Sequence, residues 1–259
     1  MLGADHWPFP MLRSDAGQGA IHPPSFSAVM SVEIEEGIKW YLAFLASTVV
    51  HEAAHAWAGE RLGDDTAARG GQASLDPIPH LRREPLGMIV VPIISFLAGG
   101  WMIGWASAPF NPQWAAQYPR RSGLMAMAGP ASNLLLCLIA AILMLIGLSV
   151  GFFSTPTSFA FTHLVDSGPS DLSEFAGRML SIFFSLNLLL ATFNLLPLPP
   201  LDGSNAPMIF LPENGGRAWQ RLISNPNLRF FGLFIAWKVF GIVFPPIHQA
   251  AVHFIFRNG

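Results

Sequence analysis

Residues 38–60 read IKWYLAFLASTVVHEAAHAWAGE, with no charged side chain between Lys39 and Glu52. The letters HEAAH within this segment form an H-E-x-x-H motif. Residues four apart on an α-helix lie on one face, so the imidazoles of His51 and His55 can reach one metal ion. The carboxylate of Glu52, between them, can take a proton from a water molecule that such a metal activates. The segment predicts a metal-binding helix that is apolar enough to enter a bilayer.

The composition of the whole chain also indicates a membrane protein. Of its 259 residues, 52% are hydrophobic and only 12% are charged, and the mean hydropathy is +0.44. About a quarter of the residues of a typical globular domain are charged. The 21 phenylalanines and 8 tryptophans suit a lipid-facing surface with interfacial anchors. A formal net charge of −2 indicates no nucleic-acid partner.

Five apolar stretches are long enough to cross a bilayer or nearly so, since a crossing helix needs about 20 residues. They cover residues 38–60, 86–107, 123–153, 176–198 and 228–245. The predicted fold class is an all-α polytopic membrane protein, a helical bundle with four to five transmembrane spans. Residues 1–37 are expected to form an N-terminal extension, either interfacial or disordered. Residues 38–259 are expected to form a single membrane-embedded domain, whose last apolar stretch stops at Pro245-Pro246.

The arginines favour a re-entrant course for residues 86–107, which Pro92 and Gly99-Gly100 interrupt. Loops rich in Lys and Arg tend to lie on the cytoplasmic side. If all five stretches crossed, the arginine-bearing loops 61–85 and 108–122 would lie on opposite sides. If 86–107 instead enters and returns, both loops lie in the cytoplasm, and so does the arginine-bearing loop after the fourth stretch. The alternative is five ordinary spans with a poor charge bias.

A catalytic zinc usually takes three protein ligands and leaves one position for water, so the motif needs a third ligand. Polar loop 61–85 offers several candidates, although such side chains are ordinarily just solvated: Asp64, Asp65, Asp76, His80 and Glu84. Asp202 is different, because it follows an apolar span directly and would share the depth of His55 in the favoured topology. An ionisable group on membrane-embedded structure is costly unless it is paired or metal-bound. The alternative is that Asp202-Gly203 only forms a turn after a proline-ended helix.

Three motifs together resemble the site-2 protease family of intramembrane zinc metalloproteases, in its small bacterial branch without extra regulatory domains. The first is the H-E-x-x-H motif in a hydrophobic helix. The second is N-x-x-P-x-P-x-L-D-G at residues 194–203, and the third is A-G-P-x-x-N at residues 128–133. The resemblance covers residues from about 40 to about 212. It implies one Zn²⁺ per chain on His51, His55 and Asp202, with Glu52 as the general base.

The resemblance also suggests residues that contact the substrate. The family's asparagine before the proline-rich turn helps to hold an unwound substrate, which implies that role for Asn194. Pro197 begins a stretch that cannot form regular helix, so it can expose backbone to a substrate. The alternative is that the prolines only end the helix. Asn133 is expected to make an interhelical hydrogen bond and is also a candidate substrate contact.

The predicted function is therefore an intramembrane zinc metalloprotease in the cell (inner) membrane, with several spans and an active site open to the cytoplasm. Its expected partners are the lipid bilayer and a single-span membrane protein or signal-peptide-like substrate. One alternative is a catalytically silent scaffold or chaperone of the same fold. Another is a transporter with an incidental motif, which would need further intramembrane ionisable groups beyond Lys238. The sequence carries no signal for an oligomeric state.

Overall fold

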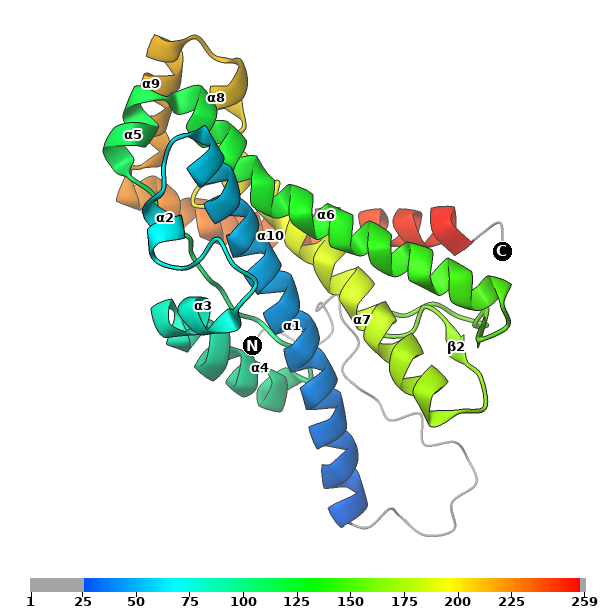
Figure 1. Ribbon diagram of the computed structural model, residues 1–259. Helices are drawn as coiled ribbons and strands as arrows, with labels where there is room; N and C mark the ends of the chain where they lie inside the picture. The colour runs from blue at the N-terminus through cyan, green and yellow to red at the C-terminus, as the bar shows by residue number, and fades with distance from the viewer. Residues whose placement is uncertain (1–25, 257–259) are drawn as a thin grey trace, which may run out of the picture.

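The motif helix is longer than the sequence predicts. A computed structural model describes the backbone of residues 26–256 and the side chains of residues 33–256 (Figure 1). Helix α1 spans Phe26–Leu62, so no helix boundary lies near residue 38. The part of the expected extension from Phe26 onward continues the motif helix. Its first 25 residues lie outside the described part of the chain.

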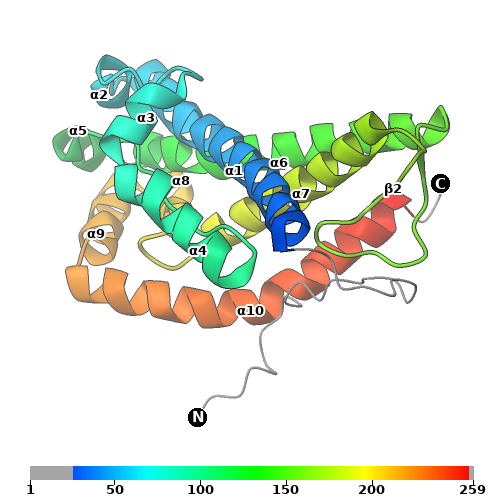
Figure 2. The same cartoon turned by 90° about the horizontal axis from the view of Figure 1, so that it is seen from below.

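Three further long helices complete the bundle: α6 (Pro119–Ser149), α7 (Asp171–Asn194) and α10 (Pro226–Phe256). All three are long and apolar enough to cross a membrane. Helices α1, α6 and α7 pack against one another, and α7 lies between α6 and α10 when the molecule is seen from below (Figure 2). These helices confirm the all-α membrane fold, while the count of four to five spans stays a prediction.

The last helix corrects one boundary. The sequence predicts that the final apolar stretch stops at Pro245-Pro246, but α10 continues through both prolines to Phe256. A proline inside a helix removes one hydrogen bond and clashes with the carbonyl four residues earlier, which kinks a helix as often as it ends it. The carbonyl of Gly241 is one of the two affected, and this glycine has open space where a Cβ would be. The helix therefore has room to bend there and resume.

The stretch after the polar loop forms a hairpin. A π-helical turn, η2 (Leu86–Val90), leads into α4 (Val91–Gly99), and Gly100 reverses the chain at φ 72°. The two helical pieces together rise only about 21 Å, which is too short to cross a bilayer core of about 30 Å. The chain then returns alongside, with the amide of Trp105 donating to the carbonyl of Gly87. This return confirms the expected reversal of residues 86–107.

The returning segment of the hairpin is held against the polar loop and α1. The carbonyl of Ser107 accepts hydrogen bonds from Gln72 and Arg83, and its hydroxyl donates to Glu84. Gly104 lies so close to the Phe44 ring of α1 that a Cβ there would clash with it. The hairpin is therefore a part of the bundle that packs beside the motif helix.

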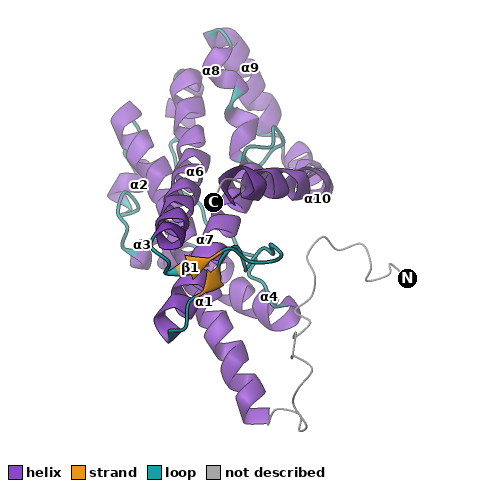
Figure 3. Cartoon of the chain, turned by 90° about the vertical axis from the view of Figure 1, so that its right-hand side faces the viewer, coloured by secondary structure: helices purple, strands orange, loops and turns teal. Residues whose placement is uncertain are grey.

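Shorter elements cap the two ends of the bundle. One end gathers α2 (Thr66–Arg69), α5 (Pro112–Gln117), α8 (Pro207–Phe210) and α9 (Glu213–Ile223), with α3 (Pro77–Arg83) beside them (Figure 1). The other end carries the antiparallel strands β1 (Phe153–Ser154) and β2 (Asp166–Ser167). In the described residues these two strands form the one sheet (Figure 3).

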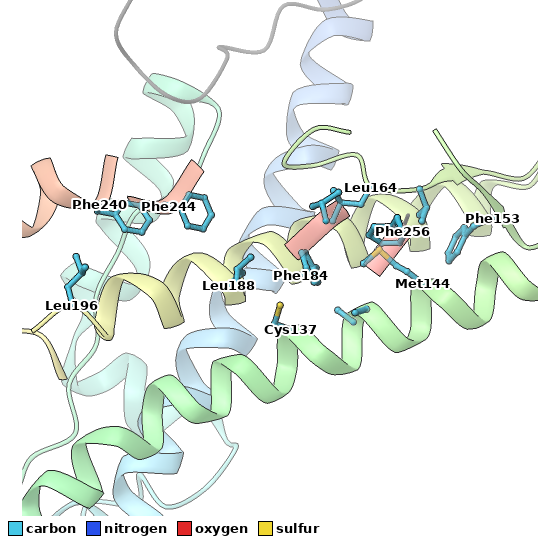
Figure 4. Packing of buried hydrophobic residues seen from close by; sticks show 14 of the residues in the cluster. Cys137, Met144, Phe153, Leu164, Phe184, Leu188, Leu196, Phe240, Phe244 and Phe256 are labelled. Carbon is cyan, nitrogen blue, oxygen red and sulfur yellow. The ribbon is translucent and has the colours of Figure 1, made fainter. Parts of the chain in front are cut away.

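A continuous apolar core joins α6, α7 and α10 (Figure 4). Met144 of α6 and Phe184 of α7 are almost fully buried in it, and Phe240 and Phe244 of α10 stack on each other at 5.0 Å. Leu196 and Leu201 join the same cluster from the chain that follows α7. The core thereby extends from the helices into the turn that carries Asp202.

Candidate metal centre

The two motif histidines meet on the buried face of α1. Only 7% of the surface of His51 and of His55 is exposed, and their Nε2 atoms lie 3.0 Å apart. Their rings pack edge to face with centroids separated by 4.7 Å. Glu52, between them in the sequence, is also buried. The helical spacing of the motif therefore produces the predicted juxtaposition.

The turn after α7 brings Asp202 to the same point. Its Oδ2 atom lies 3.2 Å from Nε2 of His51 and 3.3 Å from Nε2 of His55. Asp202 begins the 3₁₀ turn η3 (Asp202–Asn205), and the next residue must be small, because a Cβ at Gly203 would overlap the carbonyl of Leu195. Helix α10 presses on the same turn, since a Cβ at Gly232 would overlap the carbonyl of Pro199.

Hydrogen bonds at the far side of each ring decide which nitrogen faces the centre. Nδ1 of His55 donates to the carbonyl of Met125 at 2.9 Å, and Nδ1 of His51 lies 2.5 Å from Oδ1 of Asn133. A neutral imidazole has one N–H, so both Nε2 atoms carry lone pairs. With neutral rings, the Nε2 lone pairs of His51 and His55 then lie within hydrogen-bond distance of each other and of a carboxylate oxygen of Asp202. All three atoms are acceptors, and none has a hydrogen to donate.

Such a set of acceptors can bind a cation. Among the described residues, His51, His55 and Asp202 form a group that could hold a metal ion, with ligand atoms within 4.8 Å of one another. Zinc binds histidine nitrogen and carboxylate oxygen at about 2.0–2.2 Å in a tetrahedron, whose ligand atoms are then about 3.3 Å apart. The observed separations of 3.0–3.3 Å match that spacing. Two histidines and one carboxylate also leave a fourth position for water or substrate.

A glycine of α6 makes room for the ion. A Cβ at Gly129 would overlap the Nε2 atoms of both His51 and His55. The backbone of α6 therefore approaches the point where the three ligand atoms converge. This contact gives a steric reason for a glycine at this position of the A-G-P-x-x-N motif, which the sequence alone does not reveal.

We expect Gly129→Ala to weaken zinc binding by about tenfold or more, because about 1.4 kcal/mol of steric cost is worth a factor of ten. Alanine favours helix over glycine by about 1 kcal/mol, so α6 itself should be no less stable. Chelator competition measures the zinc affinity, and circular dichroism measures the helix content. Gly241→Ala is the matched control, since that helical glycine has open space around it. Wild-type zinc affinity in Gly129→Ala would contradict the steric role.

The polar-loop candidates for the third ligand have other partners. Asp64 accepts from Thr66 and from the amide of Asn111, which fastens the end of the hairpin to the loop. The remaining four pair as follows: Asp65 with Arg69, Asp76 with the amide of Ile78, His80 with the carbonyl of Ser74, and Glu84 with Ser107. None of these side chains joins His51 and His55, so Asp202 is the candidate that completes a possible metal-binding group in the described part of the chain.

The predicted substrate contacts differ in their surroundings. Pro197 is exposed, and Asn194 is half-buried with its amide donating to the carbonyl of Leu190 in its own helix. Asn133 is fully buried and makes the expected interhelical hydrogen bonds, to α1 and α7. Substrate contact by these three residues stays a prediction.

Two polar residues at the centre were not singled out from the sequence. Ser47 of α1 and Asn187 of α7 are both fully buried. Each is hydrogen-bonded to Asn133, and the two are also hydrogen-bonded to each other. Asn187 stands in a predominantly apolar span, and an amide in such a span can hydrogen-bond to a neighbouring helix. That signal was available, but the partner could not be identified without the packing of the helices.

Comparisons with known proteins agree with the geometry. The model of Peptidase family M50 matches residues 40–235. Over 165 residues, 62% of this chain, the sequence is 37% identical to "Putative zinc metalloprotease YwhC" of Bacillus subtilis (strain 168). Over 163 residues, 63% of this chain, it is 27% identical to "Putative zinc metalloprotease Rip2" of Mycolicibacterium smegmatis (strain ATCC 700084 / mc(2)155). The matches span 64% and 53% of the lengths of these relatives. No solved structure matches the chain.

Proposed function

The chain belongs to Peptidase family M50, and from that premise we propose that it is an intramembrane zinc metalloprotease that cuts within or near transmembrane segments of other membrane proteins. The observation that carries the proposal is the convergence of two imidazole lone pairs and one carboxylate at a single point between α1, α6 and the turn after α7. Helix α1 packs there against α6 and α7, both long and apolar enough to cross a membrane. The relatives named as zinc metalloproteases support the same chemistry.

His51, His55 and Asp202 would hold the zinc ion. When bound, the ion supplies Lewis acidity, which acidifies water and polarises a carbonyl group. Glu52 is buried on the same helix, one residue from His51, and is not one of the three ligands. Its carboxylate can accept a proton from the attacking water. As the C–N bond of the peptide breaks, it can return that proton to the leaving nitrogen.

The substrate must present an extended segment to this centre. A helical substrate hides its carbonyls in hydrogen bonds between residues four apart, so it has to unwind locally before attack. Pro197 and Pro200 are exposed on the turn that leads to Asp202, and neither can donate a backbone hydrogen bond. The unwound substrate would lie against this turn, beside Asn194.

The charges support an active site that opens toward the cytoplasm. Arginines gather near the α2–α5–α9 end of the bundle, toward which the metal site lies: Arg61, Arg69, Arg82, Arg83, Arg120, Arg121, Arg217 and Arg221. At the opposite end, Lys39 and Arg178 are both paired with Glu36. The hydrogen bond and charge of Lys39 also lower the pKa of the Glu35 carboxyl, so this ion pair persists at neutral pH. This asymmetry follows the positive-inside rule.

The transporter alternative gains little from the structure. It needs ionisable groups along an internal path, and Lys238 instead lies on the exposed face of α10, near the ring of Phe234. A catalytically silent scaffold would have the same fold as a protease. Cleavage therefore has to be measured directly.

We expect the purified full chain in detergent to hold about one zinc ion and to cut single-span model substrates within their apolar segments. A chelator should abolish cleavage, because the Lewis acid is removed, and added zinc should restore it. Metal content is measured by elemental analysis and the cut site by mass spectrometry. A chain that holds zinc but cuts no member of the panel would favour the scaffold. A chain that holds no zinc would refute the proposed metal centre.

A further inference from the structure

A buried polar network joins the three helices around the metal centre. Ser47 of α1, Asn133 of α6 and Asn187 of α7 are each 0% exposed, and their side chains are linked by hydrogen bonds. Polar groups in an apolar interior bond strongly, and a broken bond there is costly. The network ends at His51, so it can influence a metal ligand.

A backbone carbonyl fixes the orientation of the first side-chain amide in the network. Nδ2 of Asn187 donates to the carbonyl of Phe183 at 2.8 Å and to Oγ of Ser47 at 2.8 Å. A carbonyl can only accept, so the nitrogen end of this amide must face α7. Oδ1 of Asn187 is thereby turned toward Asn133 and accepts from its Nδ2 at 2.8 Å.

The orientation of the second amide, that of Asn133, determines which of its atoms faces His51. Nδ2 of Asn133 also donates to the backbone carbonyl of Ser47 at 3.3 Å. Its Oδ1 is therefore the atom that faces Nδ1 of His51, which must carry the hydrogen. The lone pair of His51 is left on Nε2, toward His55 and Asp202. For His55, a single bond to the carbonyl of Met125 achieves the same result.

We propose that Asn187 is a positioning residue for the metal ligand His51 and acts through Asn133 to fix its tautomer. The proposal rests on the proposed function, in that Nε2 of His51 must bind the metal. Without Asn187, Nδ2 of Asn133 keeps only the longer bond, 3.3 Å, to the carbonyl of Ser47. The loss of the 2.8 Å bond to Asn187 therefore weakens the hold on this amide and favours turning its nitrogen toward His51. Nδ1 then becomes the acceptor and Nε2 carries the hydrogen, and a protonated Nε2 cannot bind a metal ion.

The first test replaces Asn187 with leucine, which keeps the volume and removes the hydrogen bonds. Zinc affinity, measured by chelator competition on the full chain in detergent, should fall roughly 10- to 100-fold, as for other partners of metal-bound histidines. Ser185→Ala is the matched control. Ser185 lies on α7, as Asn187 does, but its hydrogen bond goes to His248 of α10, outside the network. This substitution should leave the zinc affinity at the wild-type value.

A second substitution separates positioning from simple stability. In Asn187→Leu, the further change Asn133→Asp places a carboxylate beside His51, and a carboxylate can only accept. It holds the hydrogen on Nδ1 without help from Asn187, so most of the lost zinc affinity should return. The unfolding temperature should stay low, since a buried carboxylate replaces an amide. A merely structural role for Asn187 predicts no recovery of zinc affinity.

Nitrogen NMR of metal-free wild type with labelled histidine adds a measurement that does not depend on how a variant folds. The hydrogen of His51 should be on Nδ1 even without metal. A hydrogen on Nε2 with none on Nδ1 overturns the proposal, as does unchanged zinc affinity in Asn187→Leu or a failure of Asn133→Asp to restore it. A wild-type chain that binds no zinc overturns the proposed function instead, so the two failures are distinguishable.

Discussion

Glu52→Gln is expected to keep the zinc ion and lose cleavage. Glutamine has nearly the size of glutamate, but its amide cannot take up the proton of the attacking water or deliver it to the leaving nitrogen. Positioned acid–base groups contribute roughly 10²- to 10⁴-fold to rate, so kcat should fall by that factor. The metal should remain, because Glu52 is not among the three proposed ligands, His51, His55 and Asp202. Cleavage of a single-span substrate and zinc per chain are measured on the same preparation.

Glu60→Gln is the matched control for this change. Glu60 lies on the same helix, two turns beyond Glu52, and is exposed. Its replacement by glutamine also removes one negative charge from α1, so it reveals any effect of charge alone. Cleavage by Glu60→Gln should equal that of wild type. Full activity of Glu52→Gln would show that another group carries the proton.

Asp202→Ala is expected to lose the zinc ion. The change removes the one anionic ligand and leaves two imidazoles, so affinity should fall by more than the roughly 100-fold that loss of an outer partner can cost. The turn itself should survive, because Asn205 bonds to the backbone carbonyl of residue 202 and Ser204 to that of Leu201. Chelator competition measures the loss of zinc affinity. Circular dichroism measures the helix content and so checks that the fold survives.

The control for the third ligand is Asp76→Ala. Asp76 was a candidate from the sequence, but the structure places its carboxylate on the amide of Ile78, where it caps α3. Loss of such a cap costs about 1 kcal/mol of stability. Zinc affinity should be unchanged. If Asp76→Ala instead lost zinc and Asp202→Ala kept it, the ligand set would have to be sought in the polar loop.

The sequence by itself determined the chemistry that depends on local spacing. His51 and His55 are one turn apart, so any helix puts their imidazoles on one face. The low charge content and the long apolar stretches required a helical membrane protein, because a bilayer leaves no water for unpaired backbone groups. The arginine distribution favoured a reversal of residues 86–107, and the sequence offered Gly99-Gly100 for the bend. In the structure Gly100 adopts the positive φ that a glycine tolerates.

The tertiary structure alone decided what depends on contacts between distant segments. The sequence favoured Asp202 among six possible third ligands, but only the structure shows that the turn after α7 brings it to His51, from which it is 151 positions away in the chain. Gly129 and Asn187 carry no ligand atom, so no motif chemistry marks them; their roles appear only where α6 and α7 close on α1. Local periodicity sets which face of a helix is apolar. The choice of neighbour on that face, and hence the tautomer of His51, is set by packing.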